Sequence, residues 1–122
     1  MKSLKSVYLF CLFLVTNLSQ ANPVVEQVAD ALSPSSISRS DMIKELQWFR
    51  DASQPFRGKT ITSVSEDIPT HIWERDVLAK HFYDLTGIRV KYDILGEGAV
   101  VENIFKQVSQ GVHLYDIYVN DA

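Results

Sequence analysis

The sequence predicts an α/β fold in which a parallel sheet of βαβαβ order follows a helical N-terminal segment. Two observations carry this prediction. Residues 60–65, 88–95 and 115–119 are β-branched or alternate apolar with polar side chains, as half-buried strands do. Residues 70–86 and 100–110, which separate them, carry apolar side chains at helical spacing. Strands that alternate with helices are typical of right-handed crossovers, which place the helices across the faces of a parallel sheet.

The first 21 residues have the three-part layout of a secretory signal peptide. Lys2 and Lys5 form a basic start, residues 7–15 are all apolar, and Ser19-Gln20-Ala21 is a small-x-small cleavage pattern. The apolar stretch is shorter than the roughly 20 residues that span a bilayer. We therefore expect cleavage after Ala21, export to the periplasm, a helical segment over 22–55 and an α/β lobe over 56–122.

Cleavage leaves an acidic chain without a thiol. The signal removes Lys2, Lys5 and Cys11, which is the only cysteine, so the net charge of −3 becomes more negative by two. An acidic chain lacks the basic face that a nucleic-acid partner requires. The absence of cysteine from the remaining residues excludes a disulfide, a thiolate metal site and a cysteine nucleophile.

The N-terminal segment is expected to form two helices. The first carries apolar side chains from Val24 to Leu32 and is stopped by Ser33-Pro34. Ser40 is expected to cap the second helix, whose apolar stripe runs through Met42, Ile43, Leu46 and Phe49, and Pro55 closes the segment.

The two crossover helices are expected to begin and end at marked residues. Thr70 is the expected cap of the first, and Gly96-Glu97-Gly98 is the expected turn before the second. Gly87 and Gly111 follow the two helices, at positions where a positive φ favours glycine. The side chains expected to be buried are Trp73, Val77, Leu78, Phe82 and Leu85 in the first helix, and Val101, Ile104, Phe105 and Val108 in the second.

The candidate ligand site lies at the carboxyl ends of the strands, where open parallel sheets bind their ligands. Polar segments follow each predicted strand at 65–70, 96–98 and 120–121. Their carboxylates and amides suit the vicinal hydroxyls of a sugar, and Trp73 and Tyr118 are candidate stacking surfaces for its apolar face. The alternatives remain open: Trp73 packs in the core, and Glu66 and Asp67 stabilise the following helix N-terminus.

Three sharper motifs fail on their spacing. Gly58-Lys59-Thr60 ends like a phosphate-binding loop but lacks the earlier glycine and precedes a strand. Asp67, His71 and Glu74 share a helix start without an HExxH pattern, and no GxSxG accompanies the serines. We therefore expect no catalytic residues, no metal and no cofactor; an exported hydrolase that uses Glu66, Asp67 or His71 is the most distant alternative.

Four stretches carry a resemblance to a known family. They are ELQWFRDASQPFRGKTI (45–61), SEDIPTHIWERDVLAKHFYDLTGI (65–88), LGEGAVVENI (95–104) and YDIYVND (115–121), and they cover most of the chain after the signal. In this order they resemble the N-terminal lobe of family 1 extracellular solute-binding proteins, which are receptors of ABC importers.

The resemblance implies a two-lobed binding protein that captures a carbohydrate or polyol and docks on an inner-membrane ABC permease. By position it implies Ser65, Glu66, Glu97, Asn120 and Asp121 as ligand-binding residues, and Trp73 joins them as the stacking candidate. Because family members continue through a second lobe, we expect this chain to be a fragment that binds sugar weakly or not at all. The alternative function is a small free-standing periplasmic interaction or regulatory domain.

Overall fold

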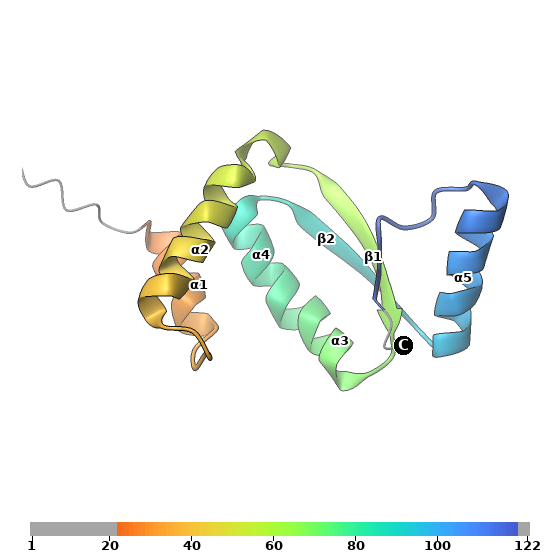
Figure 1. Ribbon diagram of the computed structural model, residues 1–122, viewed down its shortest axis with the longest axis horizontal. Helices are drawn as coiled ribbons and strands as arrows, with labels where there is room; N and C mark the ends of the chain where they lie inside the picture. The colour runs from red at the N-terminus through yellow and green to blue at the C-terminus, as the bar shows by residue number, and fades with distance from the viewer. Residues whose placement is uncertain (1–21, 120–122) are drawn as a thin grey trace, which may run out of the picture.

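The computed structural model describes residues 22–119, which form an α/β structure with a three-stranded parallel sheet. The shape is elongated, as Figure 1 shows: a pair of N-terminal helices lies at one end, the sheet lies in the middle, and the last helix lies at the other end. The predicted class and order of elements are confirmed. Asn120 and Asp121, two of the predicted site residues, lie outside the described residues.

The N-terminal pair consists of α1 (Pro23–Ala31) and α2 (Arg39–Ala52). Asn22 caps α1 by accepting a hydrogen bond from the Val24 backbone N–H. The predicted cap of α2, Ser40, is wrong. Ser38 has the extended backbone that a cap needs, and its hydroxyl accepts a hydrogen bond from the Asp41 N–H, so Ser40 falls inside the first turn.

One arginine joins the two N-terminal helices. The guanidinium of Arg39 lies 2.6 Å from carboxylate oxygens of both Glu26 and Asp30 on α1. The three side chains are substantially exposed, so these ion pairs set the geometry of the helix pair and contribute little to stability.

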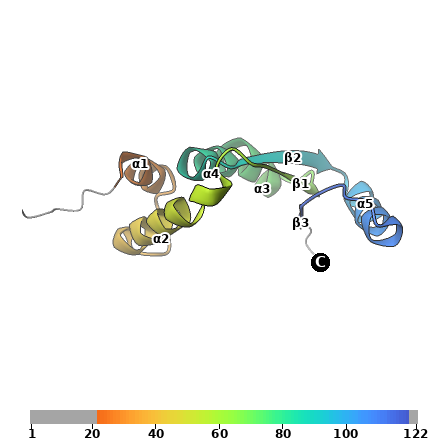
Figure 2. The same ribbon diagram turned by 90° about the horizontal axis from the view of Figure 1, so that it is seen from above.

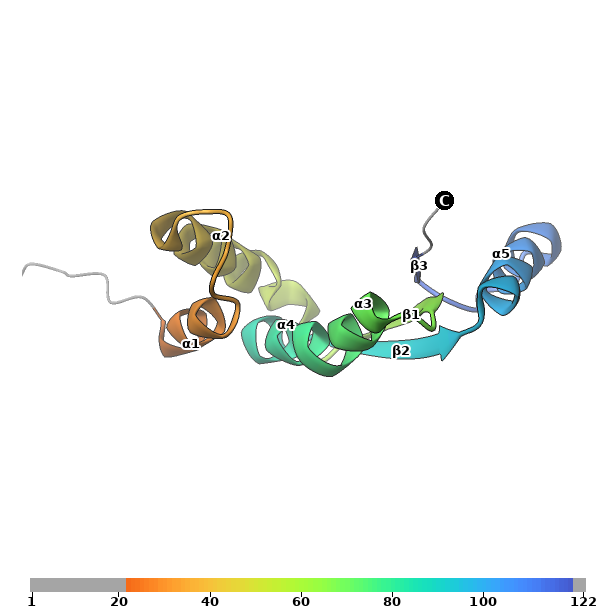
Figure 3. The ribbon, with the colours of Figure 1, turned by 90° about the horizontal axis from the view of Figure 1, so that it is seen from below.

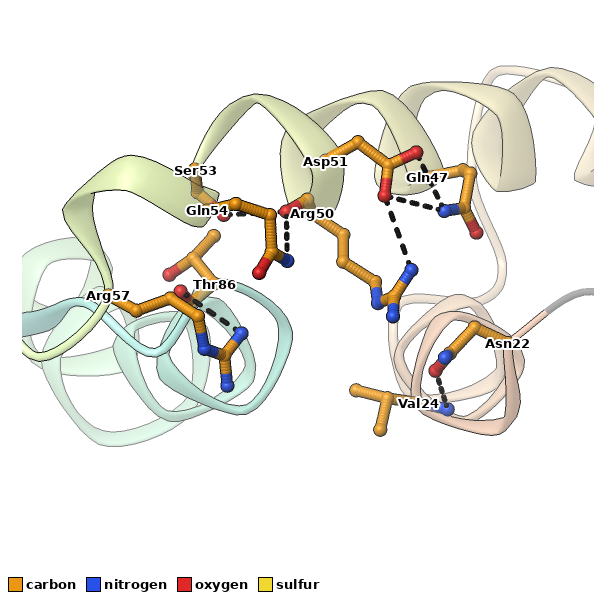
Figure 4. A network of polar contacts seen from close by, with 9 residues as sticks. All are labelled: Asn22, Val24, Gln47, Arg50, Asp51, Ser53, Gln54, Arg57 and Thr86. Carbon is orange, nitrogen blue, oxygen red and sulfur yellow. Dashed lines mark hydrogen bonds and ion pairs between the residues drawn. The ribbon is translucent and has the colours of Figure 1, made fainter.

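A short connection ties the helix pair to the sheet. The 3₁₀ helix η1 (Gln54–Phe56) follows α2 and leads into Arg57, whose side chain reaches the Thr86 carbonyl at the end of the crossover helix, as Figure 4 shows. A Cβ at Gly87 would lie 3.1 Å from the Arg57 guanidinium carbon. The next turn is fixed by a backbone bond of 2.9 Å from the Gly58 N–H to the Gly87 carbonyl.

The sheet has β1 (Thr60–Glu66) at its centre, between β2 (Arg89–Leu95) and β3 (Ile117–Val119). Both pairings are parallel; Ser63 lies opposite Tyr92 on one side and Ile117 on the other. The predicted parallel pairing of the first and third strands is therefore confirmed. The third strand starts at Ile117 and not at Tyr115 as predicted.

The first crossover is one helical run in three parts: α3 (Pro69–Trp73), the π-helical segment η2 (Glu74–Leu78) and α4 (Ala79–Thr86). The predicted cap Thr70 is wrong because Pro69 already occupies the first turn, after the extended Ile68. The predicted end is confirmed, since Gly87 has a φ of 70°.

The π-helical segment changes which side chains of this crossover are buried. A π turn holds one residue more than an α turn, so side chains on either side of it rotate by about 100° relative to a uniform helix. Leu85 is buried as predicted, whereas Trp73 is 48% exposed and Leu78 is 36% exposed. The prediction for Trp73 and Leu78 is thus wrong because it assumed uniform helical spacing.

The second crossover helix, α5 (Glu97–Gln110), starts earlier than predicted. Gly96 takes the cap position with an extended backbone, so Glu97 and Gly98 form the first helical turn and not a separate turn. The helix ends at Gly111, whose φ of 64° confirms the predicted stop. Two of its predicted core residues are wrong, since Phe105 is 70% and Val108 is 78% exposed.

The helices cover opposite faces of the sheet. Ile61, Val90 and Tyr92 lie against α4, whereas the hydroxyl of Tyr118 donates a hydrogen bond to the Gln107 side chain of α5. Since side chains alternate along a strand, Val64 faces α5 and Ser63 faces α4. Figure 2 shows the sheet with α4 and α5 displaced to its two sides. Within residues 22–119, no helix has the length and apolar content needed to cross a bilayer.

The buried core is small and lies in two places. One group belongs to the N-terminal helices and the other to the sheet and its crossover helices. The buried apolar residues are Val25, Val28, Ala29 and Met42 in the first group, and Val64, Leu85 and Val100 in the second.

Val64→Ala is expected to lower the free energy of unfolding by about 2 kcal/mol, because the side chain is fully buried at the centre of the sheet and its removal leaves a cavity. The matched control is Val108→Ala, at a position that is 78% exposed, which should change stability by less than about 0.5 kcal/mol. Urea unfolding followed by circular dichroism measures both, and equal losses would contradict the assigned core.

Candidate functional site

The strand order defines a divergence point between β1 and β3. From β1 the chain crosses to β2 on one side, and from β2 it crosses back to β3 on the other side. Ligands of open parallel sheets bind at the carboxyl ends of the two strands where the connections part. Here those ends are Glu66 of β1 and the neighbourhood of Val119, which pairs with Ser65.

Glu66 is held at this point by the helix that follows it. Glu66 is only 5% exposed. Its backbone carbonyl accepts hydrogen bonds from the Ile68 N–H (2.9 Å) and from His71 Nδ1 (3.1 Å). Because a carbonyl can only accept, His71 carries its proton on Nδ1 in this arrangement. His71 is itself 5% exposed, so it anchors α3 beneath the end of β1.

Ser65 lies inside the structure and not on its surface. It is fully buried, and its neighbour on the same face, Ser63, is 1% exposed. Neither hydroxyl oxygen has a hydrogen-bond partner among the described residues. Both face the side of the sheet that carries the first crossover helix, so a ligand that reaches Ser65 must displace part of that packing.

The other predicted site residues are spread over a wider area. Glu97 is exposed at the N-terminus of α5, beyond β2, which the strand order places one strand away from the β1–β3 divergence. Trp73 is half exposed on α3, the helix that starts three residues after Glu66. The Tyr118 hydroxyl bonds to the Gln107 side-chain oxygen at 3.0 Å, so its ring is tied to α5. Ser65 and Glu66 are consecutive on β1, so their side chains face opposite sides of the sheet. The structure therefore places both at the same strand end without bringing their side chains together, and it leaves Glu97 apart.

A glutamine that the sequence pattern does not single out holds the approach to β3. The side-chain oxygen of Gln107 accepts from the backbone N–H groups of Leu114 (2.7 Å) and Tyr115 (3.0 Å), and its amide donates to the Tyr115 carbonyl. Tyr115 in turn donates its hydroxyl to Asp93 at 2.9 Å. Burial, followed by this bond, raises the pKa of Tyr115. On a helical wheel Gln107 is an ordinary surface residue, so its role depends on where the returning loop passes.

Asp116 fixes β3 against β1. One of its carboxylate oxygens accepts from the Thr62 backbone N–H at 2.7 Å and from the Thr62 hydroxyl at 3.0 Å, while its own N–H bonds to the Thr62 carbonyl. The backbone bond and then the hydroxyl bond hold the pKa of Asp116 below its usual value, with a smaller contribution from the nearby His113.

The arrangement does not make a catalytic triad. In a triad the histidine base lies between the hydroxyl nucleophile and the carboxylate. Here the carboxylate of Asp116 lies between the Thr62 hydroxyl and the His113 ring, so the order is wrong for that chemistry. Within the described part of the chain, no group of three or more His, Cys, Asp or Glu side chains is placed to hold a metal ion.

A hollow lies away from the strand ends, between the N-terminal helices and the α4 face of the sheet. We call it the apolar groove; its volume is about 370 Å³, and none of its lining residues is Lys, Arg, Asp or Glu. Representative lining residues are Val28, Leu46, Phe49, Ile61, Phe82 and Ile117. It has few polar groups to orient a polar ligand, so the strand ends remain the candidate site for a sugar.

Comparison with known proteins yields no assignment. No family model matches the chain, and the curated proteins and the solved structures likewise give no match.

The bond between Asp116 and Thr62 is expected to make stability depend on pH. A carboxyl whose pKa is lower in the folded state adds stability above its unfolded pKa of about 4, and this contribution is lost as the pH falls through the folded value. Asp116→Asn retains an acceptor oxygen but cannot titrate, so the urea midpoint of this variant should fall less steeply than that of the wild type on acidification. The exposed Asp51→Asn is the control, and an unchanged slope in the Asp116 variant would contradict the assignment.

Proposed function

We propose that the chain is the ligand-capturing N-terminal lobe of an exported solute-binding protein, which takes up a carbohydrate or polyol and delivers it to an ABC permease. The observation that carries the proposal is the β2-β1-β3 order, which puts the buried Glu66 at the divergence of two parallel strands. The resemblance of residues 45–121 to family 1 solute-binding proteins supports the same role.

The chemistry at the β1 end suits a neutral polyhydroxyl ligand. A carboxylate accepts hydrogen bonds from neighbouring hydroxyls, and bonds to a charged group are stronger than those between neutral groups. Trp73, half exposed on the next helix, offers an apolar ring of the kind that packs on a sugar face. In a two-lobed receptor a second lobe closes over such a surface by a hinge motion.

A free-standing interaction domain is the second candidate function. It is favoured by the apolar groove, whose uncharged walls suit an apolar protein segment better than a sugar.

Ligand capture is tested by titrating the ¹⁵N-labelled protein with a panel of sugars and polyols. We expect amide shifts confined to residues 65–68 and the end of β3, with a dissociation constant on the order of millimolar because one lobe covers little of the ligand. Glu66→Gln should abolish the shifts, whereas Glu45→Gln, at an exposed position on α2, should leave them unchanged. Shifts concentrated elsewhere, or shifts that Glu66→Gln leaves unchanged, would contradict the proposed function.

Export is tested by expressing residues 1–122 in a Gram-negative host and sequencing the N-terminus of the product. We expect the periplasmic protein to begin at Asn22. Cleavage there keeps the α1 cap, because the Asn22 side chain accepts the Val24 N–H. A product that keeps Met1 and stays in the cytoplasm would contradict the assigned signal.

A further inference from the structure

The apolar groove requires an uncharged occupant. It runs between α2 and the sheet face that carries α4, and Phe49 and Ile117 on its walls are 47% and 39% exposed. Apart from His81 and Tyr92, the lining side chains are apolar, so a charged or strongly polar occupant would lose hydration and gain few partners there. The groove therefore fits a row of apolar side chains on a regular element.

The same chain presents such a row on α5. Val101, Phe105 and Val108 recur at intervals of four and three residues, which places them along one side of the helix. We call this row the α5 stripe. Phe105 and Val108 are the most exposed of the large apolar side chains, at 70% and 78%, and the stripe carries no charge.

The two surfaces of one molecule cannot meet. The N-terminal helices that wall the groove and α5 lie at opposite ends of the elongated structure, with the sheet between them, as Figures 1 and 3 show. Contact between them therefore requires two molecules.

We propose that the chain associates head to tail, with the α5 stripe of one copy seated in the apolar groove of the next. Insertion of an apolar helix face into a hydrophobic groove is a common recognition mode. Because both surfaces are uncharged, joining them buries no unpaired ion. The contact uses two different surfaces, so each bound copy still has one of each free, and the association continues beyond a dimer unless its rotation closes a ring. This inference goes beyond ligand capture and uses none of the residues at the β1 end.

The test uses two variants of residues 1–122 that each lose one surface. Phe105→Asp places a charge in the α5 stripe, and Phe49→Asp places a charge in the wall of the apolar groove. Both positions are exposed in the folded monomer. By sedimentation equilibrium the wild type should exceed dimer mass as its concentration rises. Each variant alone should stay monomeric, with a dissociation constant raised more than about tenfold. An equimolar mixture of the two should form a 1:1 dimer and stop there.

Two matched controls change exposed residues outside the two surfaces. Phe56→Asp changes an exposed aromatic residue that does not line the groove, and Lys106→Asp changes an exposed residue on the other side of α5; both should associate as the wild type does. If Phe105→Asp fails to fold by circular dichroism, Val108→Asp replaces it. A wild type that is monomeric at all concentrations, a mixture that does not dimerise, or a dimer that survives Phe49→Asp would each overturn the proposal.

Discussion

The placement of β1 between two parallel neighbours is the constraint on which the rest of the structure depends. A central strand pairs on both edges, so its residues set the register of β2 and β3 at once. The helical connections must then cross opposite faces, because β2 and β3 lie on opposite sides of β1. That arrangement buries Val64, brings α3 directly beneath the carboxyl end of β1 and leaves Glu66 at the divergence of the connections.

The third strand is too short to hold its own position. Three residues of ladder provide few backbone bonds, and side chains supply the rest of the attachment. Asp116 binds the backbone and hydroxyl of Thr62, and Gln107 binds the loop that leads to the strand. The end of β3 is therefore positioned from both sides, by a carboxylate on the sheet and an amide on α5. Asp116 and Gln107 therefore determine the geometry of any site at this strand end.

Local sequence signals predicted the order of elements but not their exact caps or faces. Alternation and helical spacing located all three strands and both crossovers, and Gly87 and Gly111 ended the helices as expected. Caps failed because several polar residues stand near each helix start, and the backbone conformation that chooses Ser38 over Ser40 is a tertiary property. The predicted faces failed around η2, since the π turn shifts the side chains before it relative to those after it, and only the later ones, such as Leu85, kept the predicted face. The sequence pattern predicted that the candidate site lies at the strand ends. It could not predict that Ser65 is buried, which depends on packing, or that Glu97 lies apart, which depends on strand order.

The polar strand end and the apolar groove suit different kinds of binding partner. A sugar that entered the groove would give up hydrogen bonds to water, and a lining without Lys, Arg, Asp or Glu returns few of them. An apolar helix at the strand end would offer no hydrogen-bond donors to the polar groups there, and Glu66 is already only 5% exposed. Each surface therefore excludes the partner of the other. A chain with both can hold a polar ligand at one place and a protein surface at another, and neither event competes with the other for residues.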